Sequence, residues 1–468
     1  MSKQKALLKS TLLLAVGKLS TQFVAFLLVP LYTFFLSPAE YGLVDLIVTY
    51  TILLAPAATL QMEMAVFRFL VDARDDEAEK KRIISNTVQI ALASTVLLAV
   101  LFIGVNALVH IPHAGLILGL GMVTILLNLA LQIARGLGKN KEFAFSSIAI
   151  ALTNIVAAIG LVVIAKLGIA GVFSAMLLAN TMGLLYVFFK LGLYKYISFH
   201  EQDRGLKREL VHYSLPLIPN SISWWVIGLF DRTIIAIFLG IAANGIYAVS
   251  SKYAAIFGSI FSIFGMSWTE AASMHINDKE RQSFFSDVFN TGVRAFGALG
   301  LLLIVALPFV IGLVDKAYAE ASLYVPLLII AAFLNAIVGL YSGIYVARKM
   351  TRQVMTTSLI AAGINITLNF ALISFIGLYA AAIATTAGYG AMAIYRHFDL
   401  KSFIRIDYDK RVLALLGLLY GGVIYLYYLN MPIVNILNVV IVIAAALLLN
   451  KKLVNLFVRK LSRGRIAT

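Results

Sequence analysis

The chain has 468 residues, of which 61% are hydrophobic and 13% are charged, and its mean hydropathy is +0.93. Soluble domains carry about 25% charged residues, so a water-soluble fold is excluded and lipid is expected to surround most of the chain. The formal charge is +16 and cysteine is absent, which excludes disulfides and thiolate chemistry.

Long apolar segments follow one another and are typical of membrane-spanning helices. The stretch Met1–Lys9 is basic, but the apolar segment after it continues to Leu36, which is too long for a cleaved signal peptide and predicts a signal anchor. Backbone polar groups in hydrocarbon need internal partners, and segments of about 20–28 residues provide them as helices rather than as barrel strands. We predict fourteen such helices, at residues 10–35, 41–66, 84–109, 114–137, 143–167, 169–196, 211–238, 243–268, 288–314, 321–347, 353–376, 378–398, 411–429 and 431–450.

The basic residues predict how these helices are oriented. With the N-terminus inside, 32 of the 38 Lys and Arg residues fall in inside segments, two in outside connections and four within apolar segments. This is the positive-inside pattern, so we predict that both termini are cytoplasmic. The same placement puts the basic residues against anionic headgroups, and no nucleic-acid partner is expected.

The chain also repeats itself at an offset of just over 200 residues. The turn Ser37–Gly42 resembles Gly240–Gly245, and Gly168–Val172 resembles Gly377–Ala381. Both halves begin inside, which predicts parallel repeats related about the membrane normal and alternating access between them. The predicted fold is all-α and polytopic, with an N-lobe at 1–200 (helices 1–6), a C-lobe at 201–400 (helices 7–12), and helices 13–14 with a basic cytoplasmic tail at 401–468.

Charged residues at membrane depth are the main candidates for a functional site. Each basic residue near the bilayer centre costs about 2.5–3.5 kcal/mol to insert, so it is expected to face a water-filled cavity or a partner. The candidates for binding an anionic substrate are Lys18, Lys252, Arg232 and Arg294. A structural ion pair stays open for Arg232, and exposure to headgroups stays open for Arg294.

Two acidic and two aromatic residues complete the candidate site. Asp45 and Asp231 are titratable groups at membrane depth and are candidates for ion coupling, with structural pairing as the alternative. Trp224 and Trp225 are candidates for stacking on a sugar or for anchoring in the lipid interface. No catalytic residues, metal site or cofactor are predicted; protons, sodium and membrane potential stay open as the source of energy.

The segment Tyr213–Trp225, followed by Asp231 and Arg232, is the most specific sequence pattern in the chain, and it resembles the seventh helix of Wzx-type polysaccharide flippases. Weaker matches are Leu36–Gly42, Ala65–Phe69, and Tyr324–Ile330 with Ala347–Thr351. The resemblance spans nearly the whole chain and implies the multidrug/oligosaccharidyl-lipid/polysaccharide (MOP) exporter superfamily, whose fold has two six-helix lobes around a central cavity and, in some members, two further helices.

The resemblance implies a transporter and not an enzyme. Its expected substrate is an undecaprenyl-diphosphate-linked oligosaccharide, a polysaccharide repeat unit, moved from the inner to the outer leaflet of the bacterial cytoplasmic (inner) membrane. Membrane lipids are expected partners, and polysaccharide polymerase and glycosyltransferases are further candidates. A diphosphate is anionic and fits the basic residues, whereas the alternative, a cation-coupled multidrug exporter of the same superfamily, would favour an acidic cavity. A membrane enzyme would need larger outer loops.

Overall fold

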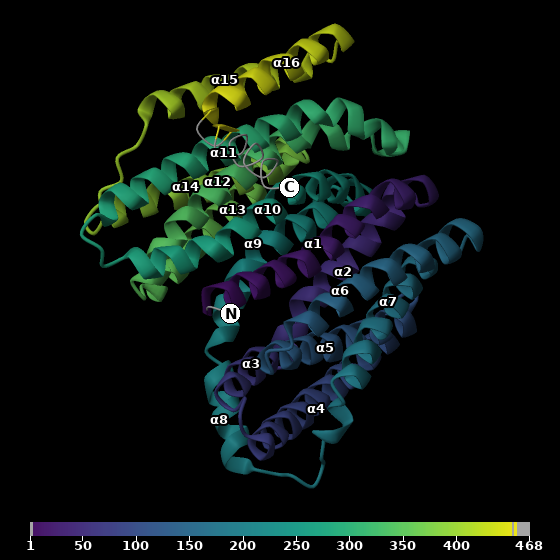
Figure 1. The fold of residues 1–468 in the computed structure, drawn as a ribbon. Helices are drawn as coiled ribbons and strands as arrows, with labels where there is room; N and C mark the ends of the chain where they lie inside the picture. The colour runs from purple at the N-terminus through teal and green to yellow at the C-terminus, as the bar shows by residue number, and fades with distance from the viewer. Residues whose placement is uncertain (1–2, 452–453, 456–468) are drawn as a thin grey trace, which may run out of the picture. The chain divides into compact units, whose positions relative to one another are not determined.

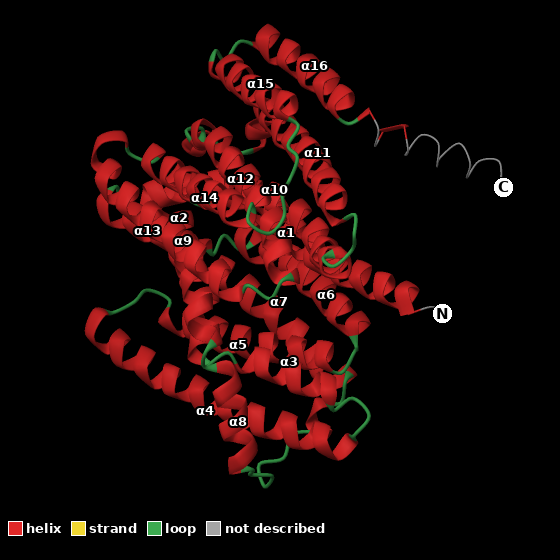
Figure 2. Cartoon of the chain, turned by 90° about the vertical axis from the view of Figure 1, so that its left-hand side faces the viewer, coloured by secondary structure: helices red, strands yellow, loops and turns green. Residues whose placement is uncertain are grey.

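A computed structural model describes residues 3–451 and 454–455, and the side chains of these residues except at 3–16, 18–19, 57, 219–229 and 351. This part of the chain holds sixteen α-helices and no strand (Figures 1 and 2). The helices of the first half are α1 (Lys3–Phe35), α2 (Pro38–Ala58), α3 (Met62–Asp72), α4 (Glu77–Val109), α5 (Ala114–Gly136), α6 (Asn140–Ala158), α7 (Gly168–Lys190) and α8 (Arg204–Ser214). Those of the second half are α9 (Leu217–Phe238), α10 (Ile241–His275), α11 (Arg281–Val310), α12 (Ala321–Ala347), α13 (Thr351–Ile376), α14 (Tyr379–Leu400), α15 (Lys410–Tyr428) and α16 (Pro432–Leu449).

Each of the fourteen predicted segments coincides with helix, which confirms the all-α membrane fold. Among the described residues, eleven helices are long and apolar enough to cross a membrane, and Ser20–Phe35 is a shorter apolar helix. These helices expose large hydrophobic side chains, among them Leu97, Leu108 and Ile433. A helix in water would bury such a face, so hydrocarbon is the expected neighbour.

Contacts divide the chain into two compact units, residues 1–248 and 249–468, with the division inside α10. In the first unit, α1 packs on α6, α7 packs on α5 and α6, and α3 packs on α5. In the second unit, α14 packs on α12 and α13, and α16 packs on α11. The lobe boundary at residue 200 rests on the internal repeat and stays a prediction.

The second predicted segment, 41–66, is broken into α2 and α3 by residues 59–61. Leu60 and Gln61 have φ angles of 53° and 59°, the left-handed region that is costly for residues other than glycine. Pro56 lies just before the break, and the Gln61 amide bonds the Pro56 carbonyl at 2.7 Å. A proline lacks an amide donor and crowds the preceding turn, so Pro56 weakens the last turns of α2 just before the break.

The seventh predicted segment, 211–238, also differs from the structure, because its first residues belong to a separate helix, α8. Leu206 and Leu210 of α8 are buried, while Arg204 and Arg208 are exposed. An eleven-residue helix with one apolar and one charged face is too short to span a bilayer. Its apolar face packs against α3 and α4 of the first unit.

Candidate functional site

The two turns that repeat in the sequence lie against each other in the first unit. α2 and α10 approach so closely that a Cβ added at Gly42 would overlap the carbonyl oxygen of Ile241, and a Cβ at Gly245 would overlap the backbone of the opposite turn. The buried Asn244 side chain donates from Nδ2 to the Gly42 carbonyl oxygen at 2.9 Å. Glycine allows this approach because it has no Cβ.

An ion pair between α2 and α9 is buried in the same unit. Arg232 Nε lies 2.6 Å from Asp45 Oδ2, and the two side chains are 16% and 5% exposed. The neighbouring Asp231 faces a different helix, where it accepts a hydrogen bond from the Tyr247 hydroxyl at 3.1 Å. Adjacent helical residues point about 100° apart, which allows Arg232 to pair with α2 while Asp231 bonds Tyr247 of α10.

These contacts form one surface, which we call the outer seam because it lies at the predicted outer ends of the helices. The outer seam consists of Gly42, Asp45, Arg232, Asn244 and Gly245, with a 2.8 Å hydrogen bond between the Tyr50 and Thr233 hydroxyls beside it. Removing one partner of a buried ion pair costs about 3–5 kcal/mol, whereas exposing both partners to water restores their hydration. These contacts therefore stabilise the closed outer seam, and hydration of both charged side chains offsets the lost ion pair when the seam opens.

At the predicted inner side of the first unit, α4 holds the chain segment that follows α7. Ser85 Oγ accepts the Ser198 amide and Asn86 Oδ1 accepts the Asp203 amide, each at 3.0 Å. The Asp203 carboxylate caps α8 and forms an ion pair with Arg82. We call this set of contacts the first clasp.

The second unit has a matching set of contacts, the second clasp, where α11 holds the segment that follows α14. Ser286 Oγ accepts the Asp407 amide and Asn290 Oδ1 accepts the Asp409 amide, each at 3.0 Å. The Asp409 carboxylate caps α15 and lies 2.5 Å from Arg294 Nη2. The substrate-binding candidate Arg294 therefore has a carboxylate partner in this structure.

The remaining candidates are placed as follows. Lys252 lies half-buried on α10 in the second unit. The side chains of Lys18, Trp224 and Trp225 lie outside the described part of the structure. Their assignments to substrate binding stay predictions. No cluster of three side chains able to hold a metal ion occurs among the described residues.

Arg396 on α14 is a buried cation that sequence reasoning missed. It is 0% exposed, and its guanidinium donates to the Val338 carbonyl at 3.1 Å, to Thr357 Oγ1 at 2.9 Å and to Ser342 Oγ. The guanidinium carbon also lies 5.4 Å from the centre of the Tyr345 ring. These partners belong to α12 and α13, so Arg396 ties three helices of the second unit together. The sequence signal for this buried site was the presence of Ser342 and Thr357, two polar residues inside the tenth and eleventh apolar segments.

Comparison with known proteins identifies a family and several solved structures that share this architecture. Residues 7–269 match a family model described as "Polysaccharide biosynthesis protein". No curated protein matches the chain.

Several solved structures share the fold. Lipid II flippase MurJ in an inward closed conformation is 15% identical, with a TM-score of 0.70, and the match covers 96% of this chain and 99% of that one. A MATE structure in complex with MaL6 is 13% identical, with a TM-score of 0.61 over 85% of this chain and 96% of that one. A MOP superfamily transporter from Pyrococcus furiosus, described as having a binding pocket of reverse polarity, is 13% identical, with a TM-score of 0.60 over the same shares of the two chains.

Proposed function

Because the chain belongs to the polysaccharide biosynthesis protein family of the MOP exporter superfamily, we propose that it flips an undecaprenyl-diphosphate-linked oligosaccharide from the inner to the outer leaflet of the bacterial cytoplasmic membrane. The outer seam is the observation that carries this proposal. It joins two turns related by the internal repeat, with a glycine contact and one ion pair. Glycosyltransferases that supply the lipid-linked unit and a polymerase that consumes it are the proposed partners.

Alternating access requires that the outer seam open and close during each cycle. Opening separates Gly42 from Gly245 and takes Arg232 away from Asp45. A diphosphate arriving beside Arg232 supplies a replacement anion for the guanidinium, which binds phosphate through paired N–H donors. Replacement of Asp45 by the diphosphate at Arg232 would then favour the open seam, because the diphosphate binds that state better.

Lys18 and Lys252 are the proposed binding cations deeper in the membrane. A lysine is a compact charge on a flexible stem and suits a phosphate that must bind and then leave. Replacing Lys18 or Lys252 with Gln should reduce translocation while the folded protein stays in the membrane, and replacement with Arg should do less harm. The measurement is translocation of lipid-linked oligosaccharide in a strain that lacks its own flippase, with protein levels compared. Wild-type translocation by both Gln variants would contradict the cationic site.

A crosslink across the outer seam tests alternating access. The Tyr50 and Thr233 hydroxyls meet at 2.8 Å, and the chain has no cysteine of its own. A Tyr50→Cys/Thr233→Cys protein treated with a short bifunctional maleimide should lose translocation, and the two single-cysteine proteins should keep it after the same treatment. Full translocation by the crosslinked protein rules out a moving outer seam.

A further inference from the structure

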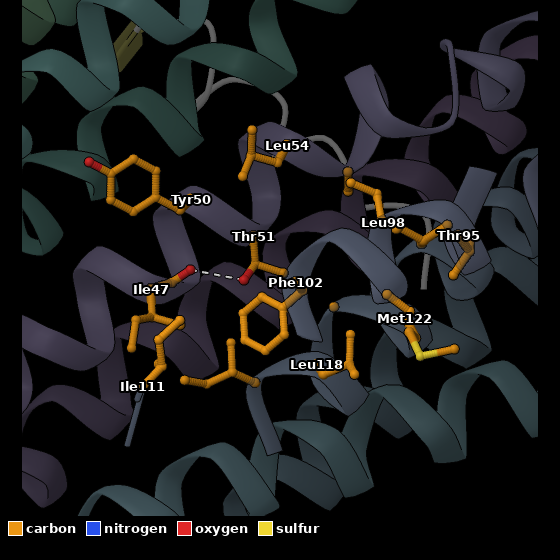
Figure 3. A pocket seen from close by; sticks show the side chains of 15 residues that line it. Ile47, Tyr50, Thr51, Leu54, Thr95, Leu98, Phe102, Ile111, Leu118 and Met122 are labelled. Atoms are coloured by element: carbon orange, nitrogen blue, oxygen red, sulfur yellow. Dashed lines mark hydrogen bonds between the residues drawn. The ribbon is translucent and has the colours of Figure 1, made fainter. Parts of the chain in front are cut away.

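An apolar cavity of about 240 Å³ lies in the first unit between α2, α4 and α5. Figure 3 shows the side chains that line it, and none of the fifteen lining residues is charged. The hydroxyl groups of Tyr50, Thr51 and Thr95 in its wall already have hydrogen-bond partners. The cavity therefore offers little to an anion, and recognition of an anion in this unit falls to other residues.

Arg135 is a half-buried cation in the last turn of α5, at the predicted inner side of the first unit. Its guanidinium carbon lies 4.9 Å from the centre of the Phe67 ring of α3 and 6.0 Å from the centre of the Phe143 ring of α6. Nη1 donates to Gln132 Oε1 at 3.0 Å. A guanidinium stacks well on aromatic faces, so these contacts hold the side chain of Arg135 between three helices.

Arg135 has no acidic partner. No carboxylate lies within 4.0 Å of its guanidinium in the part of the chain that the structure describes. Asp72, at the end of α3, pairs instead with Arg68 at 2.5 Å. A partly desolvated charge interacts with an anion more strongly than a fully hydrated one. An anion bound at Arg135 would therefore offset the cost of removing the guanidinium from water.

A structural role at the end of α5 does not account for Arg135. The last carbonyls of a helix attract cations, but at α5 Arg74 takes this position. Its Nε donates to the Gly136 carbonyl at 2.8 Å, and its Nη2 donates to the Arg135 carbonyl at 3.3 Å. The Arg135 guanidinium lies against the rings of α3 and α6 instead, which leaves N–H groups for another ligand.

Hydrocarbon lies close to this guanidinium. Met64 and Phe145 follow or precede the two rings by less than one helical turn, and they are 42% and 57% exposed. Exposed apolar side chains at this depth meet lipid. An anion carried by a membrane lipid can therefore reach Arg135 while its apolar chain stays in the bilayer.

We propose that Arg135 binds the phosphate ester of a lipid in the inner leaflet. Guanidinium binds phosphate through paired N–H donors, and basic pockets between membrane helices on the cytoplasmic side are typical sites for lipid headgroups. The exposed Lys139 and Lys141 of the α5–α6 connection add positive charge on the water side. A phospholipid and the carrier lipid of the proposed function both supply such a phosphate. The site goes beyond that function and does not depend on it.

The second unit offers a matched control. Arg348 follows α12 on the predicted inner side, and its guanidinium carbon lies 4.8 Å from the centre of the Phe403 ring. Unlike Arg135, it is exposed and contacts one ring rather than two. Arg348→Gln and Arg135→Gln each remove one charge and a ring contact, but only Arg135→Gln removes the proposed site.

The test uses the full chain in a maltoside detergent, which contains no phosphate. The probes are a phosphatidylglycerol and a prenyl diphosphate, each with a photoreactive diazirine beside the phosphate, and a diacylglycerol with the same diazirine is the neutral reference. At least one phosphate probe should crosslink to the α5–α6 connection or to α3 beside Phe67. Arg135→Gln should reduce this labelling about tenfold, and Arg348→Gln should keep it. The phosphate probe that labels more strongly identifies the lipid.

Four results overturn the inference: no labelling by either phosphate probe, equal labelling by the neutral reference, undiminished labelling of Arg135→Gln, or an equal loss in Arg348→Gln. If Arg135→Gln does not fold, Arg135→Lys takes its place. Lysine keeps the charge but lacks the paired donors of a guanidinium, so labelling should still fall. Labelling of Arg135→Lys at the wild-type level overturns the inference in that case.

Discussion

The outer seam and the two clasps hold chain segments together by different means. The outer seam depends on the close approach of Gly42 and Gly245, on the single hydrogen bond from Asn244 to the Gly42 carbonyl and on one ion pair. Each clasp instead bonds two backbone amides to side chains of one helix and caps the helix that follows. Leaving a buried amide without a partner costs about 1–3 kcal/mol, so a clasp resists opening. The outer seam is suited to opening as two backbones part, and the clasps are suited to staying closed.

The two clasps also differ from each other in the position of the arginine. Arg82 lies one helical turn before Asn86, whereas Arg294 lies one turn after Asn290. Since both helices run outward from the predicted inner side, Arg294 is the deeper of the two, and its side chain is 27% exposed against 48% for Arg82. The two clasps thus share the hydrogen bonds to backbone amides but differ in the position of the arginine along the helix.

The largest expected effect follows from preventing the outer seam from closing. Gly245→Ala puts a Cβ onto the opposite backbone, and a shift of only 1.4 kcal/mol changes the ratio of closed to open protein about tenfold. Translocation should fall by about that factor. A cysteine at Ser37 should become more reactive toward a membrane-impermeant maleimide. Gly258→Ala on the same helix is the control, because a Cβ there meets nothing within 4 Å. Equal translocation by the two variants would show that the glycine contact is not used in transport.

The ion pair of the outer seam should give the next largest effect. Asp45→Asn and Arg232→Gln each leave one buried partner and should cost about 3–5 kcal/mol of stability. The double variant should cost less than the sum of the two single variants, as measured by thermal unfolding in detergent.

Replacement of the two aspartates tests ion coupling. Asp45→Asn and Asp231→Asn variants with normal protein levels and unchanged pH dependence of translocation would remove both residues as coupling sites.

Hydropathy was sufficient to place helix at each of the fourteen predicted segments because the signal of an apolar segment is local. The break between α2 and α3 was not predicted because residues 59–61 lie inside a continuous apolar segment, and the separate helix α8 was not predicted because its last residues join the apolar segment that follows. The repeat predicted that two turns are equivalent. It did not predict that they touch, because contact depends on how helices pack rather than on local pattern.

The candidate site was predictable only in part, for the same reason. Helical geometry means that Asp231 and Arg232 cannot be assumed to pair with each other, and the structure pairs Arg232 with Asp45 of α2. The partner of Arg232 is 187 residues away, and a single sequence contains no signal for such a pair. Arg396 was counted with the basic residues of the predicted inner side, because charge alone does not distinguish a buried arginine from a topogenic one.

A smaller effect would sharpen the comparison of the two clasps. Asn86 is 0% exposed and Asn290 is half-buried, although each accepts one backbone amide and donates to one carbonyl. Asn86→Ala should therefore cost about 2–3 kcal/mol and Asn290→Ala about 1–2 kcal/mol. Thermal unfolding measures the difference, with Ser94→Ala as a control because its hydroxyl bonds only its own helix. A larger loss for Asn290→Ala would mean that burial does not set the strength of the clasps.

The smallest expected effect is the response of the clasps to pH. The amide of Leu206 and the guanidinium of Arg82 lower the pKa of Asp203, and the amide of Val412 and Arg294 lower the pKa of Asp409. A carboxylate with a lowered pKa in the folded state stabilises it fully above the ordinary carboxyl pKa, and this contribution is lost as the pH falls through the lowered value. Both clasps should therefore stay intact from about pH 5 to pH 8. Asp203→Asn and Asp409→Asn should lower the unfolding temperature and leave the shape of the translocation–pH profile in this range as in the wild type. A flattened profile in either variant would mean that a clasp opens during transport, and the division between a moving outer seam and fixed clasps would fail.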